Sequence, residues 1–90
     1  MATWTLAALL DAREAWDYIA ADDEAAADRI ADRVITAANR LDKFRSMGRP
    51  GPEGERVFHV PRTPYNIHYQ ATVEGVEILR ILHGARKWPP

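Results

Sequence analysis

One short apolar run near the C-terminal end constrains the fold more than any other stretch. Residues 76–82 read VEILRIL, and only Glu77 and Arg80 interrupt the apolar side chains. A Glu-Gly pair at 74–75 precedes the run, and Gly84 follows it. A run of this length between turn residues is typical of a strand buried on both faces rather than of a helix. We therefore expect it to form the central strand of a sheet.

Arg80 is the exceptional residue in this strand, because an unpaired charge in a buried strand is costly. One interpretation is that Arg80 pairs with Glu77 or another acid and only shapes the sheet. The other is that the polar end of the strand faces a partner or substrate, since three further polar residues follow: His83, Arg86 and Lys87. Taken alone, the stretch slightly favours the first interpretation.

Size and charge exclude several classes of protein. Ninety residues suit one domain, which we assign to 1–90. The formal net charge of -1 argues against a protein that coats nucleic acid non-specifically. The absence of cysteine excludes disulfides and thiolate metal sites. No export leader or membrane-spanning run is visible, so we expect a cytoplasmic protein.

The first half of the chain predicts a short strand and a helical hairpin. Residues 2–6 carry a weak strand signal. Apolar residues at helical spacing then predict helices over 8–20 and 24–44, with Asp23 as the N-cap of the second. Small alanines between the helices favour a tight antiparallel pair. Residues 46–55 are rich in glycine and proline, and we expect a loop that no regular element crosses.

The second half predicts three strands in an antiparallel meander. Residues 56–60 form a short strand, and a proline-bounded turn at 61–64 follows it. Residues 65–72 alternate strictly between two faces and lead through a turn into the run at 76–82. The order is therefore β-α-α-β-β-β, an α+β domain with a two-helix hairpin on one face of a small antiparallel sheet. We expect the other sheet face to be uncovered and polar.

Four segments together resemble the RelE/ParE superfamily of toxins from bacterial type II toxin–antitoxin systems. They are AREAWDYIAADDEAAADRIADRVITAANRL, GRPG, VPRTPYNIHYQ and GVEILRILHGARKW. Their order and spacing fit the superfamily over nearly the whole chain. The resemblance implies a growth-inhibiting toxin that a cognate antitoxin neutralises, and a fold that agrees with the order of elements above.

Two activities occur in this superfamily, and the chain must be placed between them. RelE-like members cleave mRNA on the ribosome with basic residues and a Tyr or His, whereas ParE-like members generally lack that set and inhibit DNA gyrase. RNA cleavage needs proton-transfer groups and cations on the phosphate. The candidates for these roles are His83 or His68 for proton transfer, and Arg56, Arg80 and Arg86 for the phosphate.

Each candidate also has a structural explanation, and the chain lacks the positive field that a nuclease on the ribosome would use. The HGARKW end also looks more like ParE-type sequences. We therefore favour the gyrase-directed branch, in which the chain is not an enzyme. The alternatives are a RelE-like endoribonuclease and an inactive domain that only binds an antitoxin.

Neither a metal nor a cofactor is expected. His59, His68 and His83 fall on three different predicted strands, and no His-x-x-x-His spacing occurs.

An antitoxin partner is expected in every case, in a hetero-oligomer of undetermined stoichiometry. Disordered antitoxin tails fold on a partner's exposed groove or sheet edge. We expect that contact on the helical hairpin and the free sheet face, with Trp4 and Trp88 as apolar anchors and Arg80 and Arg86 as polar contacts. Both tryptophans fit equally well beneath their own chain.

Overall fold

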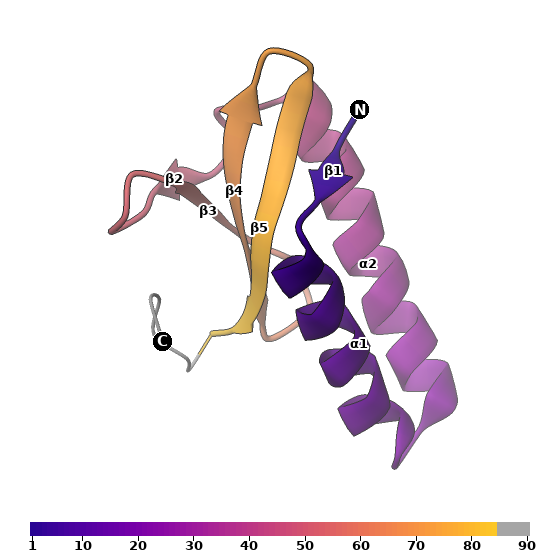
Figure 1. The fold of residues 1–90 in the computed structure, drawn as a ribbon. Helices are drawn as coiled ribbons and strands as arrows, with labels where there is room; N and C mark the ends of the chain where they lie inside the picture. Colours follow the sequence, from indigo (N-terminus) through magenta and orange to yellow (C-terminus); the bar gives the residue numbers. More distant parts are fainter. Residues whose placement is uncertain (85–90) are drawn as a thin grey trace.

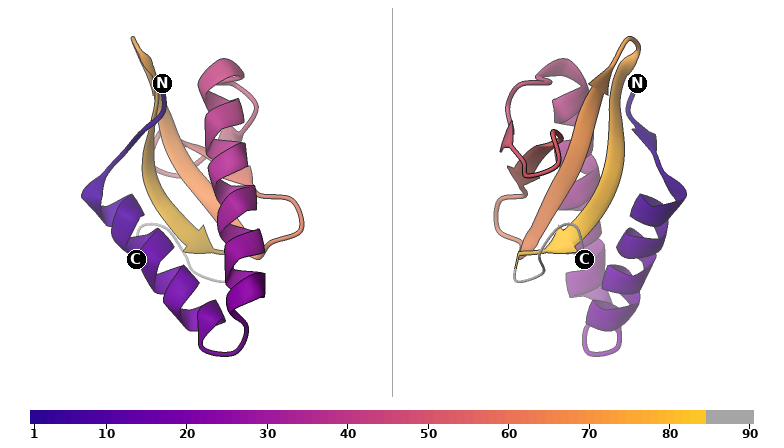
Figure 2. Two further views of the ribbon diagram at one scale, coloured as in Figure 1. Left: turned by 90° about the vertical axis from the view of Figure 1, so that its right-hand side faces the viewer. Right: turned by 60° about the vertical axis from the view of Figure 1, so that its left-hand side comes forward.

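A computed structural model describes residues 1–84, which contain two helices and five strands (Figure 1). In chain order they are β1 (Thr3–Trp4), α1 (Leu6–Ala20), α2 (Glu24–Lys43), β2 (Arg49–Pro50), β3 (Arg56–His59), β4 (Tyr65–Thr72) and β5 (Gly75–His83). The helices form an antiparallel hairpin along the sheet, as both views in Figure 2 show. The predicted α+β architecture is confirmed.

The strand order in the sheet is β1-β5-β4-β3-β2. The predicted meander of β3, β4 and β5 is confirmed, and β1 lies parallel to β5. The prediction that residues 76–82 form the central strand is wrong, because β4 occupies the middle position. β5 lies between β4 and β1, but β1 pairs with it only at Glu77 and Ile78.

Thr5 explains why the first strand is shorter and the first helix longer than predicted. Its side chain accepts a hydrogen bond from the N–H of Ala8 at 3.0 Å and so caps α1. Its hydroxyl donates to the carbonyl of Leu79 at 2.8 Å, and its N–H donates to the carbonyl of Ile78. One residue therefore ends β1, begins α1 and joins both to β5.

The loop at 46–55 contains a strand that the sequence did not predict. Arg49 pairs with Val57 and Pro50 with Arg56, which adds β2 to the edge of the sheet. An edge position tolerates proline, because one side of an edge strand needs no ladder hydrogen bond.

Helix α2 follows the prediction at its start but not at its end. Asp23 is the N-cap, and its carboxylate accepts from the N–H of Ala26 at 3.1 Å. The helix stops at Lys43, because Phe44 leaves the helical conformation at φ -120° and ψ 67°. The helix predicted over 24–44 included Phe44, whose side chain is instead 56% exposed.

The hydrophobic core lies between the hairpin and one face of the sheet. The sheet contributes three residues of the face that the alternation at 65–72 predicts, together with their neighbours on β5, whereas Ala71 of that face is exposed. Its buried members include Tyr65, Ile67, Tyr69, Val76, Ile78 and Ile81 from the sheet, and Ala8, Val34, Ala37, Ala38 and Leu41 from the helices.

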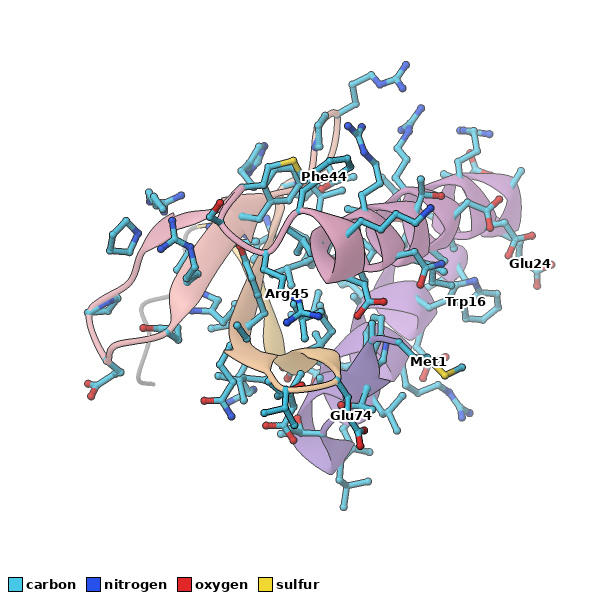
Figure 3. The ribbon with its side chains drawn as sticks, turned by 90° about the horizontal axis from the view of Figure 1, so that it is seen from above. Met1, Trp16, Glu24, Phe44, Arg45 and Glu74 are labelled. Carbon is cyan, nitrogen blue, oxygen red and sulfur yellow. The ribbon has the colours of Figure 1, made fainter. Side chains whose placement is uncertain are left out.

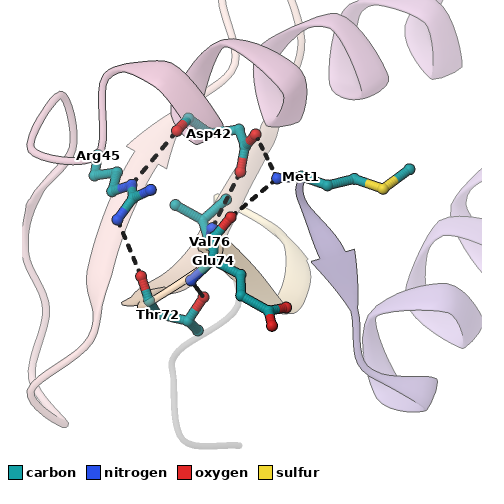
Figure 4. Close-up of polar contacts among 6 residues, drawn as sticks. All are labelled: Met1, Asp42, Arg45, Thr72, Glu74 and Val76. Atoms are coloured by element: carbon teal, nitrogen blue, oxygen red, sulfur yellow. Dashed lines mark hydrogen bonds and ion pairs between the residues drawn. The ribbon is translucent and has the colours of Figure 1, made fainter.

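A second tie joins the end of α2 to the start of β5 (Figure 4). The carboxylate of Asp42 accepts the N–H of Val76 at 3.2 Å and pairs with the ammonium of Met1 at 2.9 Å. The hydrogen bond from that ammonium lowers the pKa of Asp42, although burial opposes the shift. Arg45 extends the tie, since it donates to the carbonyl oxygens of Asp42 and Thr72.

Tyr69 offers a test of how the end of α2 is held to the sheet. Its hydroxyl donates to the carbonyl of Arg45 at 2.7 Å and accepts from the N–H of Gly48 at 2.9 Å, and the residue is fully buried. Tyr69→Phe leaves both backbone groups without this partner. We expect it to lower the free energy of unfolding by about 1–3 kcal/mol in urea titration.

Tyr18→Phe is the matched control, because Tyr18 is 75% exposed. We expect a change within about 0.5 kcal/mol for this control. Equal stabilities for the two variants would contradict the role given to the Tyr69 hydroxyl.

Candidate functional site

Arg80 is held by a carboxylate of the first helix. Its Nε and a terminal nitrogen donate to the two oxygens of Asp11 at 2.7 and 2.9 Å. Asp11 also accepts the N–H of Ile81 at 3.0 Å. The bonds to Asp11 raise the pKa of Arg80 further, against the opposing effect of burial. The interpretation that Arg80 pairs with an acid is confirmed, but the acid is Asp11 rather than Glu77.

A β-bulge places Arg80 next to that helix. Across β4 and β5, His68 pairs with Arg80 and Tyr69 pairs with Ile78, so Leu79 is an extra residue on β5. The bulge lets Ile78 and Ile81 both enter the core although they are three residues apart. Arg80 therefore lies next to the bulge, where β1 no longer covers the edge of β5.

We expected the sheet face opposite the helices to be uncovered and polar, but part of it is covered. Val57, His68 and Leu82 are buried. The segment between β2 and β3 turns back over this face, where Gly51, Pro52 and His68 are among the residues that line one pocket of about 200 Å³. The expectation is wrong because a residue of the loop at 46–55 binds a side chain on this face of the sheet.

That anchor is a buried pair between Glu55 and His68. His68 Nδ1 lies 3.0 Å from Glu55 Oε2, and the side chains of His68 and Glu55 are only 7% and 3% exposed. The other carboxylate oxygen accepts the N–H of Glu53 at 2.9 Å. Gly51 packs so closely on this carboxylate that a Cβ there would clash with it. A larger residue at position 51 would therefore have to displace the Glu55 carboxylate.

The charge of Glu55 is stabilised by the bonds it accepts. Burial raises the pKa of Glu55, but hydrogen bonds from His68 and from the backbone N–H groups of Glu53 and Glu55 outweigh burial. The pKa therefore lies below that of an ordinary glutamate.

Of the residues predicted for RNA cleavage, His68 lies opposite Arg80 across β4 and β5, but Arg56 and His83 lie apart from each other. Arg56 pairs across the sheet with Tyr69 and donates to the carbonyl oxygens of Ser46 and Gly48. His83 pairs with Tyr65, and the two rings meet edge-on with centroids 5.8 Å apart. Tyr65 and Tyr69 are four residues apart on β4, which separates Arg56 from His83 by about 13 Å along the strand direction.

Of the two tryptophans predicted to anchor a partner, Trp4 lies within the described residues and Trp88 does not. Trp4 is partly buried against the core and lines an apolar cavity of about 70 Å³ between the hairpin and the sheet, as does Trp16. Trp4 thus lies largely beneath its own chain, one of the two alternatives left open. Arg86 and Trp88 lie outside the described residues.

Residues 1–84 contain neither a cluster of metal-binding side chains nor a helix suited to crossing a membrane. No group of three or more His, Asp or Glu side chains in this part of the chain is arranged to bind a metal. Neither of its helices combines the length and the apolar character that crossing a membrane requires.

The sequence did not single out Asp11 or Glu55, although each holds a predicted candidate in place. Asp11 looked like one of several acids on the polar faces of a helix, and Glu55 like the last polar residue of a loop. The one available signal was physical: Arg80 in an apolar strand required some acid nearby.

The chain is similar to known toxins over almost its whole length. The family described as the ParE toxin of the type II toxin–antitoxin system parDE matches residues 2–88. The putative toxin Y4kP of Sinorhizobium fredii is 38% identical over 87 residues, which cover 96% of this chain and 90% of that protein. Toxin RelE2 of Caulobacter vibrioides is 39% identical over 83 residues, covering 92% and 93%.

A solved structure described as the chromosomal ParDE toxin–antitoxin system from P. aeruginosa has the same fold. Its TM-score is 0.79, its sequence identity 22%, and the match covers 91% of this chain and 92% of that one.

The pair of Asp11 and Arg80 is expected to couple α1 to the sheet. Asp11→Ala removes the carboxylate that binds the guanidinium, in a site where only 20% of the Arg80 side chain is exposed. We expect a loss of about 2–3 kcal/mol in unfolding free energy, below the ~3–5 kcal/mol of a fully buried pair because solvent screens part of the charge. Arg80→Ala in the Asp11→Ala background should cost less than it does in the wild type.

Asp17→Ala is the control, since Arg13 and Asp17 form an exposed ion pair on the same helix. It should change stability by no more than about 0.5 kcal/mol. Additive effects of Asp11→Ala and Arg80→Ala would argue against the coupling.

Glu55 is expected to contribute stability that disappears in acid. Because its pKa is lower folded than unfolded, the contribution is present above the unfolded value of about 4.3 and is lost as the pH falls through the lower folded value. Glu55→Gln should destabilise the protein at neutral pH and flatten this loss, as measured by urea unfolding at a series of pH values.

Glu53→Gln tests an exposed neighbour in the same loop and should keep the wild-type acid profile. If Glu55→Gln also kept that profile, the buried pair would not be the source of the acid sensitivity.

Proposed function

The chain belongs to the ParE toxin family of type II toxin–antitoxin systems, and from this premise we propose that it arrests growth by inhibiting DNA gyrase in the cytoplasm. The family membership establishes a toxin of this kind of system. The choice of gyrase rather than translated mRNA as the target is the proposal.

The ion pair between Arg80 and Asp11 supports gyrase rather than mRNA as the target. Metal-free RNA cleavage needs cations that face the scissile phosphate together with a proton-transfer group. Here Asp11 takes two donors of Arg80, and Arg56 bonds two carbonyl oxygens of its own loop. His68 is buried against Glu55. Arg80 and Arg56, the cations that such a mechanism would use, therefore bind other groups of the protein and stabilise its fold.

A cognate antitoxin is part of the same proposal. The structural relative from P. aeruginosa is described as a ParDE toxin–antitoxin system. By analogy, we propose that a small protein encoded beside this chain binds it and keeps it inactive. Such partners commonly contribute a segment that folds on binding.

Purified chain, freed from antitoxin, should block supercoiling of relaxed plasmid by gyrase or trap the linear DNA of the cleavage complex. Induction in cells should stop growth while primer extension shows translated messages intact. His83→Ala should arrest growth as strongly as the wild type, because gyrase inhibition needs no imidazole at this position.

His59→Ala is the matched control, since both histidines are exposed ends of strands. Codon-positioned cuts in mRNA that His83→Ala abolishes and His59→Ala retains would replace the proposal with ribosome-dependent RNA cleavage. Unimpaired growth after induction would instead indicate an inactive domain that binds an antitoxin.

A further inference from the structure

An open groove runs along the outer side of α2, away from α1. It consists of two hollows of about 340 and 570 Å³ that share Arg40 and Met47. One wall is α2 from Asp32 to Lys43, and the other walls come from residues 44–47, β3 and the turn at 60–62. We call it the α2 groove.

Basic side chains dominate the rim of the α2 groove. They are Arg33, Arg40, Lys43 and Arg62, and a single carboxylate, Asp32, accompanies them. The whole chain has 12 basic and 13 acidic residues, so this surface departs sharply from the average. None of the four forms an ion pair within residues 1–84. The groove therefore favours a negatively charged occupant.

Backbone contacts hold part of this rim in place. Arg33 donates to the carbonyl of Arg62 at 3.3 Å, which links α2 to the turn across the groove. Arg62 has a φ of 61°, a conformation that non-glycine residues seldom adopt. Figure 3 shows Phe44 on the outer side where α2 ends, while Arg45 turns back toward Thr72. Arg45 therefore does not add its charge to the rim.

The floor of the groove is apolar, which favours a peptide over a nucleic acid as the occupant. Ala37 and Val60 form its buried base, Phe58 is half-buried, and Met47 is 37% exposed. A single nucleic-acid strand would stack its bases on exposed aromatic faces, and among the groove residues Phe44, at the end of α2, offers such a face. The concave apolar base along α2 instead accepts the apolar side chains of an amphipathic helix.

We propose that the α2 groove binds an acidic amphipathic segment of the cognate antitoxin, about three helical turns long. From Arg33 to Lys43 the helix rises about 15 Å, which sets this length. The apolar side of the segment would lie on the floor, and its carboxylates would meet the rim. This inference rests on the proposed antitoxin, and it puts the contact on the outer side of the hairpin rather than on the sheet face.

The test measures binding of the purified, fluorescently labelled antitoxin encoded beside this chain. Arg40→Glu combined with Arg62→Glu reverses two exposed charges on the rim. We expect the dissociation constant to rise at least about tenfold, because opposite charges become like charges. Arg13→Glu combined with Arg49→Glu makes the same change in net charge at exposed sites outside the groove, and it should leave the constant nearly unchanged.

Growth separates this inference from the proposed function. The rim variant should arrest growth as the wild type does, but co-expressed antitoxin should no longer rescue the cells. If the wild-type chain does not inhibit gyrase, the proposed target is wrong, but the binding measurement still tests the α2 groove. Equal loss of antitoxin affinity in the rim and control variants, or no loss in either, would overturn the inference.

Hydrogen exchange of the wild-type chain gives a readout that needs no variant. Antitoxin should slow exchange in residues 44–47 and 60–62, which line the groove outside helices and strands. Slowing confined to the opposite sheet face would overturn the inference. Unchanged antitoxin binding in a rim variant that has lost salt-dependent binding to a DNA duplex would identify the groove as a nucleic-acid surface instead.

Discussion

The position of the helical hairpin depends on one carboxylate. Asp11 receives the guanidinium of Arg80 and the N–H of Ile81, residues that follow it by 69 and 70 positions. β1 covers the edge of β5 at only two residues, so beyond Ile78 this side chain takes the place of a neighbouring strand. A charged donor and a backbone donor would otherwise face a partly buried edge without that partner, which is costly.

The bulge at Leu79 makes this contact compatible with a continuous core. A regular strand would place Ile78 and Ile81 on opposite faces, because side chains alternate along it. The extra residue lets both enter the core and brings Arg80 to the edge beside α1. A single irregularity thus serves packing and the ion pair together, because a regular strand with Ile78 in the core would also turn Arg80 toward the core.

The small net charge of the chain conceals two surfaces that differ in charge. Between α1 and the end of β5, the groove lined by Tyr18 and His83 carries Glu14 beside the Asp11–Arg80 ion pair. Along the outer side of α2, arginines surround an apolar floor. The helical hairpin separates the two surfaces, so partners of different chemistry can meet different sides of one small domain. Average composition cannot reveal this separation, because the charges cancel in the sum.

The sequence by itself determined the order of the main elements, the cap at Asp23, the alternating strand at 65–72 and the kinship with RelE/ParE toxins. These follow from local periodicity, turn residues and motif order, which neighbouring residues encode. Only the tertiary structure decided that Asp11 holds Arg80, that Glu55 holds His68, and that β2 joins the sheet edge. Such contacts join residues far apart in the chain, and they depend on strand register and a bulge that no local pattern specifies.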